Sequence, residues 1–121
     1  MSDFVRREPQ LPDLPARLCE WSPGFARSRE AARVAPDFDL ATVVADAFGE
    51  YVLRLASTDD RGPDLHDALG AVEKMAVSED PEAQHCAVLG VLIRLQAHAP
   101  ELVADVGPAS TALYRRWGHL A

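Results

Sequence analysis

The 121-residue sequence has few of the features that mark secreted, metal-binding or nucleotide-binding proteins. It has only two cysteines, Cys19 and Cys86, and no Cys-x-x-Cys pair, so we interpret both as small buried hydrophobic residues, although a bridge between them stays possible. It has no glycine-rich phosphate loop and no dinucleotide-binding fingerprint. It has neither a signal peptide nor an apolar run near the ~20 residues that cross a bilayer. We therefore expect a cytoplasmic protein that folds without a metal, a cofactor or a disulfide.

Positive charge is scarce in the middle of the chain. The net charge is −7, and Lys74 is the sole lysine. Residues 37–105 carry four basic and fourteen acidic side chains, a net −10, whereas residues 1–36 and 106–121 carry +1 and +2. An acidic surface repels phosphate groups, which argues against binding to nucleic acid or to an anionic membrane. It attracts a basic partner protein instead.

Strand patterns are also missing, because no stretch alternates convincingly between apolar and polar residues. The sequence predicts an all-α, single-domain bundle of about five to six helices, compatible with HEAT-like stacked hairpins. Residues 1–36 form a Pro/Arg-rich segment with short helices packed on the core. Residues 37–121 form the helical core domain.

The stretch from Asp80 to Ala97 is predicted to be the central helix. Asp80 can cap its start, and Pro81 suits the first helical position because it has no N–H to lose. Residues 86–93 carry no polar side chain, so we expect the helix to be buried nearly all round, with Leu89 in the core. Gly90 is expected where another helix passes close by.

Helical spacing of apolar residues predicts the other helices. One covers about 40–56 with Asp39 as its cap, and another covers 65–77 with Asp64 as its cap. The link between the 65–77 helix and the central helix is so short that the two should form an antiparallel hairpin. Further helices are expected at 12–21, at 24–34, from Pro100 to Gly107, and from Pro108 onward.

An acidic line is predicted on the outer face of the 40–56 helix. Asp39, Asp46 and Glu50 lie within about 40° of one another, roughly opposite the apolar stripe. Ordinary solvation of an outer helix face is the simpler explanation of such a line, since charged outer faces are the norm. The functional interpretation is a partner-binding surface, which we extend to three further candidate residues, namely Asp59 and Asp60 in the following turn and Tyr114 on the last helix.

Residues that could carry catalysis are sparse. Glu82 and His85 have the Glu-x-x-His spacing of carboxylate-bridged metal centres, but such centres need a second pair and further glutamates, and the sequence has no second pair. His66 lies beside two aspartates, yet no nucleophile accompanies it. Neither cysteine has neighbours that favour a thiolate. We therefore predict a protein that is not an enzyme, with a metal-dependent enzyme using Glu82 and His85 as a distant alternative.

Three segments carry a resemblance: LATVVADAFGEYVLRL, ALGAVEKMAVSEDPEAQHCAVLGVLIRL and VGPASTALYRRW. In order and spacing they resemble a group of small, acidic, all-helical bacterial proteins, over about residues 40–117. Members of that group occur near polymorphic toxin genes, so the resemblance implies an immunity protein. Val106 replaces the usual Leu before Gly107, and the segment up to Pro36 has no counterpart in the group. The group has no catalytic residues to transfer.

The sequence thus predicts a protein that binds and blocks a basic partner, most plausibly a cognate toxin. Acidic side chains would take the place of the toxin's anionic substrate and speed the encounter. The alternative is a helical adaptor or scaffold that has no toxin partner.

Overall fold

The computed structural model describes residues 13–58 and 62–117, and every regular element in these ranges is helical. The all-α prediction is confirmed, since no strand occurs within them. The elements are α1 (Leu14–Trp21), α2 (Pro23–Ala26), α3 (Arg29–Arg33), η2 (Ala35–Asp37), α4 (Ala41–Ser57), α5 (Pro63–Val77), α6 (Pro81–His85), η3 (Cys86–Leu92), α7 (Ile93–His98), α8 (Glu101–Val106) and α9 (Pro108–Trp117).

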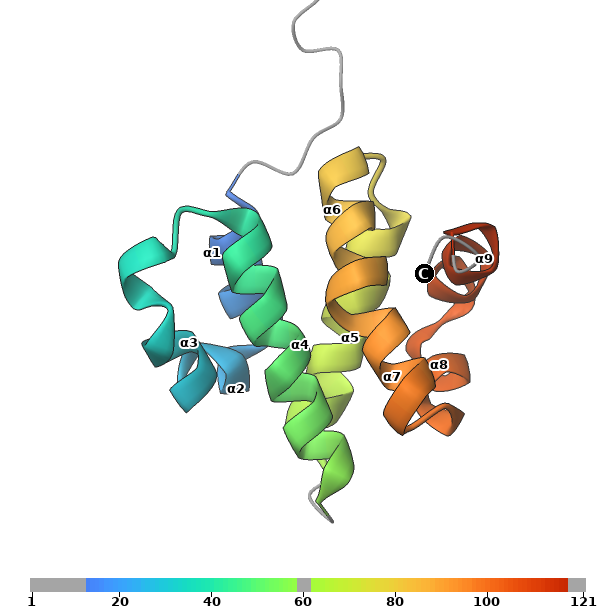
Figure 1. Ribbon diagram of the computed structural model, residues 1–121, viewed down its shortest axis with the longest axis horizontal. Helices are drawn as coiled ribbons and strands as arrows, with labels where there is room; N and C mark the ends of the chain where they lie inside the picture. Colours follow the sequence, from blue (N-terminus) through green and yellow to red (C-terminus); the bar gives the residue numbers. More distant parts are fainter. Residues whose placement is uncertain (1–12, 59–61, 118–121) are drawn as a thin grey trace, which may run out of the picture.

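The centre of the molecule is made of three long helical segments (Figure 1). Helix α4 lies beside the continuous helix formed by α6, η3 and α7, and both begin at the same end of the molecule. Helix α5 runs in the opposite direction behind them, which confirms the predicted hairpin. The short helices α1 to α3 pack on the α4 side, and α8 and α9 pack on the other side.

The central helix begins as predicted. The Asp80 carboxylate accepts a 3.0 Å hydrogen bond from the Glu82 backbone N–H, and Pro81 occupies the first turn. Residues Cys86–Leu92 then form a π-helical segment before the α-helix resumes. Such segments occur frequently at functional sites.

The prediction that this helix is buried all round was wrong at Leu89. Val88, Leu92 and Leu95 are fully buried, but Leu89 is 46 % exposed. The outer face of the helix carries Glu82, His85 and Gln96, all exposed, and Leu89 falls on that face at helical spacing. An apolar side chain therefore stands among polar ones on the solvent side.

Two glycines let the central helices meet backbone to backbone. A Cβ atom on Gly49 of α4 would lie 1.8 Å from the carbonyl oxygen of Gly90 in η3. A Cβ on Gly90 would lie 3.1 Å from the carbonyl oxygen of Ala45. The predicted close approach at Gly90 is therefore confirmed, and its partner residue on α4 is Gly49.

Two predicted helix caps were wrong. Leu40, in an extended conformation, is the N-cap of α4, and Asp39 makes no cap hydrogen bond. The Leu40 N–H still donates to the Asp37 carbonyl, so the preceding turn runs one residue further than the sequence suggested. At α5, Pro63 takes the first helical position and makes Gly62 the N-cap, which places Asp64 inside the first turn.

The N-terminal helices contribute to the same core as α4. Phe25 of α2 lies edge-to-face on Phe48, with ring centroids 5.1 Å apart, a favourable aromatic arrangement. Glu30 of α3, whose side chain is 6 % exposed, accepts two hydrogen bonds of 2.7 and 2.9 Å from the Arg54 guanidinium. A bidentate pair of this kind fixes the orientation of α3 on α4.

This ion pair predicts a pH dependence of stability. Hydrogen bonding from Arg54 holds the pKa of Glu30 below its usual 4.5, against the burial that alone would raise it. A lowered folded-state pKa stabilises the fold above pH 4.5, and this contribution is lost as the pH falls through the lowered value. We expect Glu30→Gln to lower the unfolding free energy by about 1 to 3 kcal/mol at neutral pH. Thermal melts should show that difference shrinking in acid, and a difference independent of pH would contradict the assignment.

A second long-range contact positions the last helix. The Glu73 carboxylate of α5 accepts hydrogen bonds from the backbone N–H groups of Ala109 and Ser110, each 2.9 Å, and from the Ser110 hydroxyl at 2.8 Å. Gly107 precedes α9 with φ 151°, and a Cβ there would lie 2.4 Å from the Glu73 carboxyl carbon. The positive φ favours glycine at position 107, and Glu73 satisfies the backbone N–H groups at the start of α9.

Candidate functional site

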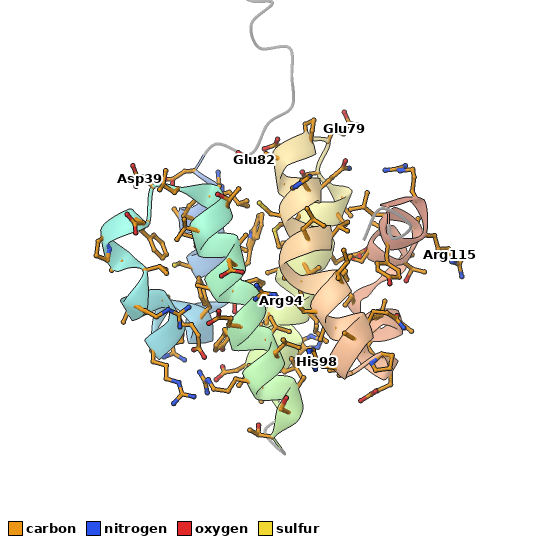
Figure 2. All side chains as sticks on the ribbon, in the orientation of Figure 1. Asp39, Glu79, Glu82, Arg94, His98 and Arg115 are labelled. Carbon is orange, nitrogen blue, oxygen red and sulfur yellow. The ribbon has the colours of Figure 1, made fainter. Side chains whose placement is uncertain are left out.

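One candidate face is formed by α4 and by the helix that begins at α6 (Figure 2). A groove of about 200 Å³ runs between these helices. We call it the front groove. It is lined by Thr42, Ala45, Asp46, His85, Cys86, Leu89 and Gly90.

The groove is hollow because its walls carry small residues where the helices come together. Ala45 is buried and Gly90 has no side chain, and Gly90 is held close to the Ala45 backbone. Leu89 forms an exposed apolar wall on the η3 side, and Thr42 is exposed on the α4 side. The groove is therefore a small hollow with mainly apolar walls, open to solvent.

Acidic side chains gather at the end of the molecule where α4 and α6 begin. Figure 2 shows Asp39, Glu79 and Glu82 at that end, and we call these three residues the acidic end. All three are exposed, and none forms an ion pair with another residue of the described ranges.

Large exposed apolar side chains are few in the part of the chain that the structure describes, and two of them adjoin the acidic end. These are Leu40, 49 % exposed and next to Asp39, and Val77, 63 % exposed and two residues before Glu79. The third is Leu89, on the same helix face as Glu82. Exposed apolar groups bordered by charge are typical of protein-binding surfaces.

The predicted acidic line is exposed, but two of its members have arginine partners. Asp46 pairs with Arg94 of α7, whose guanidinium also donates a 2.9 Å hydrogen bond to the Asp46 backbone carbonyl. Glu50 pairs with Arg33 of α3 at 2.7 Å. These pairs reduce the negative charge that both residues offer to a partner. Asp39 is the member of the line whose charge the described residues leave unpaired.

Of the remaining predicted site residues, the structure describes Tyr114 alone. Asp59 and Asp60 lie outside the described residues. Tyr114 of α9 is half-buried and packs against the core, on the α8–α9 side of the molecule. The structure therefore brings Asp39 and Asp46 to one face and leaves Tyr114 apart from them.

The residues considered for catalysis do not gather into a metal-binding cluster in the part of the chain that the structure describes. Glu82 and His85 are both exposed, and no group of three or more metal-binding side chains occurs in the described ranges. Burial, followed by the nearby Glu82 and Asp80 carboxylates, raises the pKa of the Cys86 thiol to about 11. Cys86 is thus protonated at neutral pH, and both cysteines are free.

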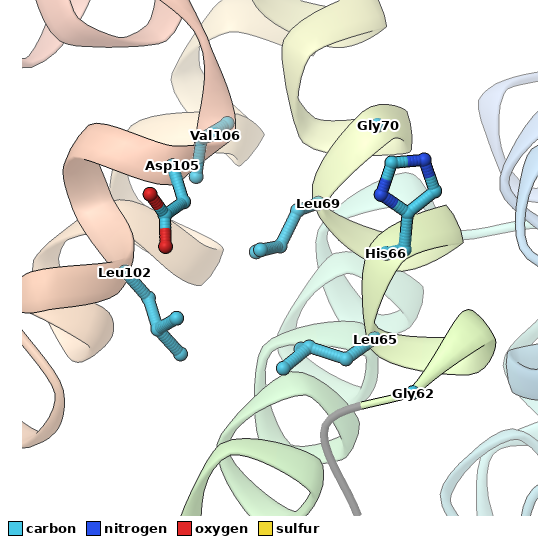
Figure 3. A pocket seen from close by; sticks show the side chains of 8 residues that line it. All are labelled: Gly62, Leu65, His66, Leu69, Gly70, Leu102, Asp105 and Val106. Atoms are coloured by element: carbon cyan, nitrogen blue, oxygen red, sulfur yellow. The ribbon is translucent and has the colours of Figure 1, made fainter.

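A second, larger pocket of about 470 Å³ lies between α5 and α8. Figure 3 shows Leu65 and Leu69 of α5 pointing across it toward α8. His66 and Asp105 are its two titratable residues, and the His66 ring lies beyond Leu69 from the Asp105 carboxylate. The polar groups of this pocket therefore do not converge on one point. In most small-molecule sites the polar groups do converge.

Sequence reasoning missed the apolar part of the front face. Leu89 was assigned to the core because it lies within an unbroken apolar run. A helical projection of Glu82, His85 and Gln96 identifies the solvent face, and Leu89 falls within it. No comparable sequence pattern indicates that Val77, at the end of α5, is exposed.

Comparisons with protein-family models, with curated proteins and with solved structures find no match for this chain. The family resemblance therefore stays a prediction. No helix in the described ranges is both long enough and apolar enough to cross a membrane.

Proposed function

We propose that this chain is a non-enzymatic binding protein, and more specifically an immunity protein that neutralises a basic bacterial toxin. The observation that carries the proposal is the combination, on one face, of the front groove, exposed Leu89 and the unpaired charges of Asp39 and Glu82. An apolar centre supplies affinity, and charges of one sign beside it select a partner of the opposite sign.

Inhibition by this face requires no catalytic step by this chain. Asp39, Glu79 and Glu82 present carboxylates where a toxin acting on an anionic substrate presents positive charge. The acidic face competes with that substrate and also speeds the encounter, because opposite charges steer association.

The test is to capture the partner and then to measure toxicity. The full chain, carrying an affinity tag, is used to isolate its partner from a lysate of its own cells, and the captured protein is then expressed alone. We expect growth arrest, relieved when this chain is expressed with it. A captured protein that is harmless alone would contradict the immunity function and favour an adaptor. Toxicity that this chain does not relieve would contradict it as well.

A further inference from the structure

The size of the front groove limits what can occupy it. Sites for small molecules usually measure about 300 to 1,000 Å³. The front groove, at about 200 Å³, is smaller than that range and open to solvent. A hollow of this size can hold one side chain that belongs to a larger molecule.

The residues that line the front groove favour an apolar side chain as its occupant. Leu89 and Ala45 line the hollow, and Cys86 contributes a neutral thiol because burial raises its pKa. Gly90 adds only backbone, which lies close to the Ala45 backbone. An aliphatic occupant would cover the exposed part of Leu89 and gain apolar contacts on two walls.

Charge differs between the two ends of the groove. At the end where the helices begin, Asp39, two residues before α4, and Glu82 of α6 have no ion-pair partners in the described ranges (Figure 2). At the other end Asp46 is paired with Arg94. A basic group on the occupant is therefore attracted to the first end.

We infer that the front groove binds one leucine-sized aliphatic side chain of a partner protein, and that a lysine or arginine beside it on the partner faces Asp39 and Glu82. This inference rests on the proposed function and specifies the partner's contact chemistry.

The test uses three capped synthetic peptides and the isotope-labelled full chain in NMR titrations. One peptide has a leucine between two pairs of lysines, the second replaces that leucine by alanine, and the third replaces the lysines by glutamates. We expect the leucine–lysine peptide to shift the amide signals of Thr42, Ala45, Leu89 and Gly90. The alanine peptide should bind about tenfold more weakly, since several buried methyl and methylene groups are lost. The glutamate peptide should not bind.

Two matched variants locate the contact. Leu89 and Leu40 are exposed to nearly the same extent, 46 % and 49 %, but only Leu89 lines the groove. Leu89→Gln should weaken binding of the leucine–lysine peptide about tenfold, and Leu40→Gln should leave it unchanged. Equal effects of the two variants, or no shifts with any peptide, would overturn the inference.

Failure of the inference can be distinguished from failure of the proposed function. Shifts confined to residues 39, 79 and 82, equal for the leucine and alanine peptides, would exclude the groove as an anchor site but leave the acidic end as a binding surface. Shifts confined to the pocket between α5 and α8 would overturn the inference and place binding on another face.

Discussion

Replacing Gly49 by alanine will lower the free energy of unfolding by about 3 kcal/mol or more, the upper part of the range for overpacked sites. The added methyl group would lie 1.8 Å from the Gly90 carbonyl oxygen. The obstacle is backbone on a central helix, so no side chain can rotate away and α4 must separate from η3. The gain in helix propensity from glycine to alanine, about 1 kcal/mol, is too small to offset this.

Alanine substitutions at two other glycines provide a comparison for the loss of stability at Gly49. Gly90→Ala places a methyl group 3.1 Å from the Ala45 carbonyl oxygen, so a shift of a few tenths of an ångström accommodates it and the loss should be smaller. Gly70 in α5 has no atom within 4 Å of its added Cβ, so Gly70→Ala should stabilise the protein by about 0.5 to 1 kcal/mol. Urea unfolding of the three variants should give this order. Equal stability of Gly49→Ala and Gly70→Ala would contradict the close packing of the two helices.

Leu92→Ala is expected to lower the unfolding free energy by about 2 to 5 kcal/mol, because the side chain is fully buried and its removal leaves a cavity. Leu89→Ala, three residues earlier in the same apolar run, should cost less than about 1 kcal/mol, since Leu89 is 46 % exposed.

The comparison between these two leucines matters more than either value. Both substitutions remove the same atoms from the same helix, so effects of composition and helix propensity cancel. Thermal or urea unfolding of the two variants measures the difference directly. A loss at Leu89 as large as that at Leu92 would mean that the outer face of this helix is buried and that the front groove is closed.

Local sequence signals predicted the helices well. The Asp80–Pro81 start, the stop at Gly107 and the start at Pro108 are recognisable because each depends on one or two adjacent residues. Even so, the caps expected at Asp39 and Asp64 were each displaced by one or two residues. Proline at the first helical position and the end of a preceding turn decide such boundaries, and both depend on local backbone conformation.

Contacts between distant residues could not be predicted. Glu73 meets the start of α9 across 36 residues, and Arg94 meets Asp46 across 48. Nothing in the local pattern around either residue indicates its partner. For the same reason the acidic line was predicted without the arginines that neutralise part of it, and Gly49 was not identified as the residue that meets Gly90.

The most direct test of the central claim is the association rate of the captured toxin with charge-reversed variants. Asp39→Lys/Glu82→Lys reverses two acids beside the front groove, and Asp67→Lys/Asp105→Lys makes the same change in net charge at exposed positions of α5 and α8. These pairs are preferable to Asp46 and Glu50, whose substitution would also break ion pairs with Arg94 and Arg33.

We predict that Asp39→Lys/Glu82→Lys slows association about tenfold or more in low salt, whereas the control pair slows it much less. Because steering is screened by ions, the dependence of the rate on salt between about 0.05 and 0.5 M should also flatten for the first variant. Equal slowing by both variants would mean that only total charge matters. Unchanged association of Asp39→Lys/Glu82→Lys would contradict the claim that this face binds the partner.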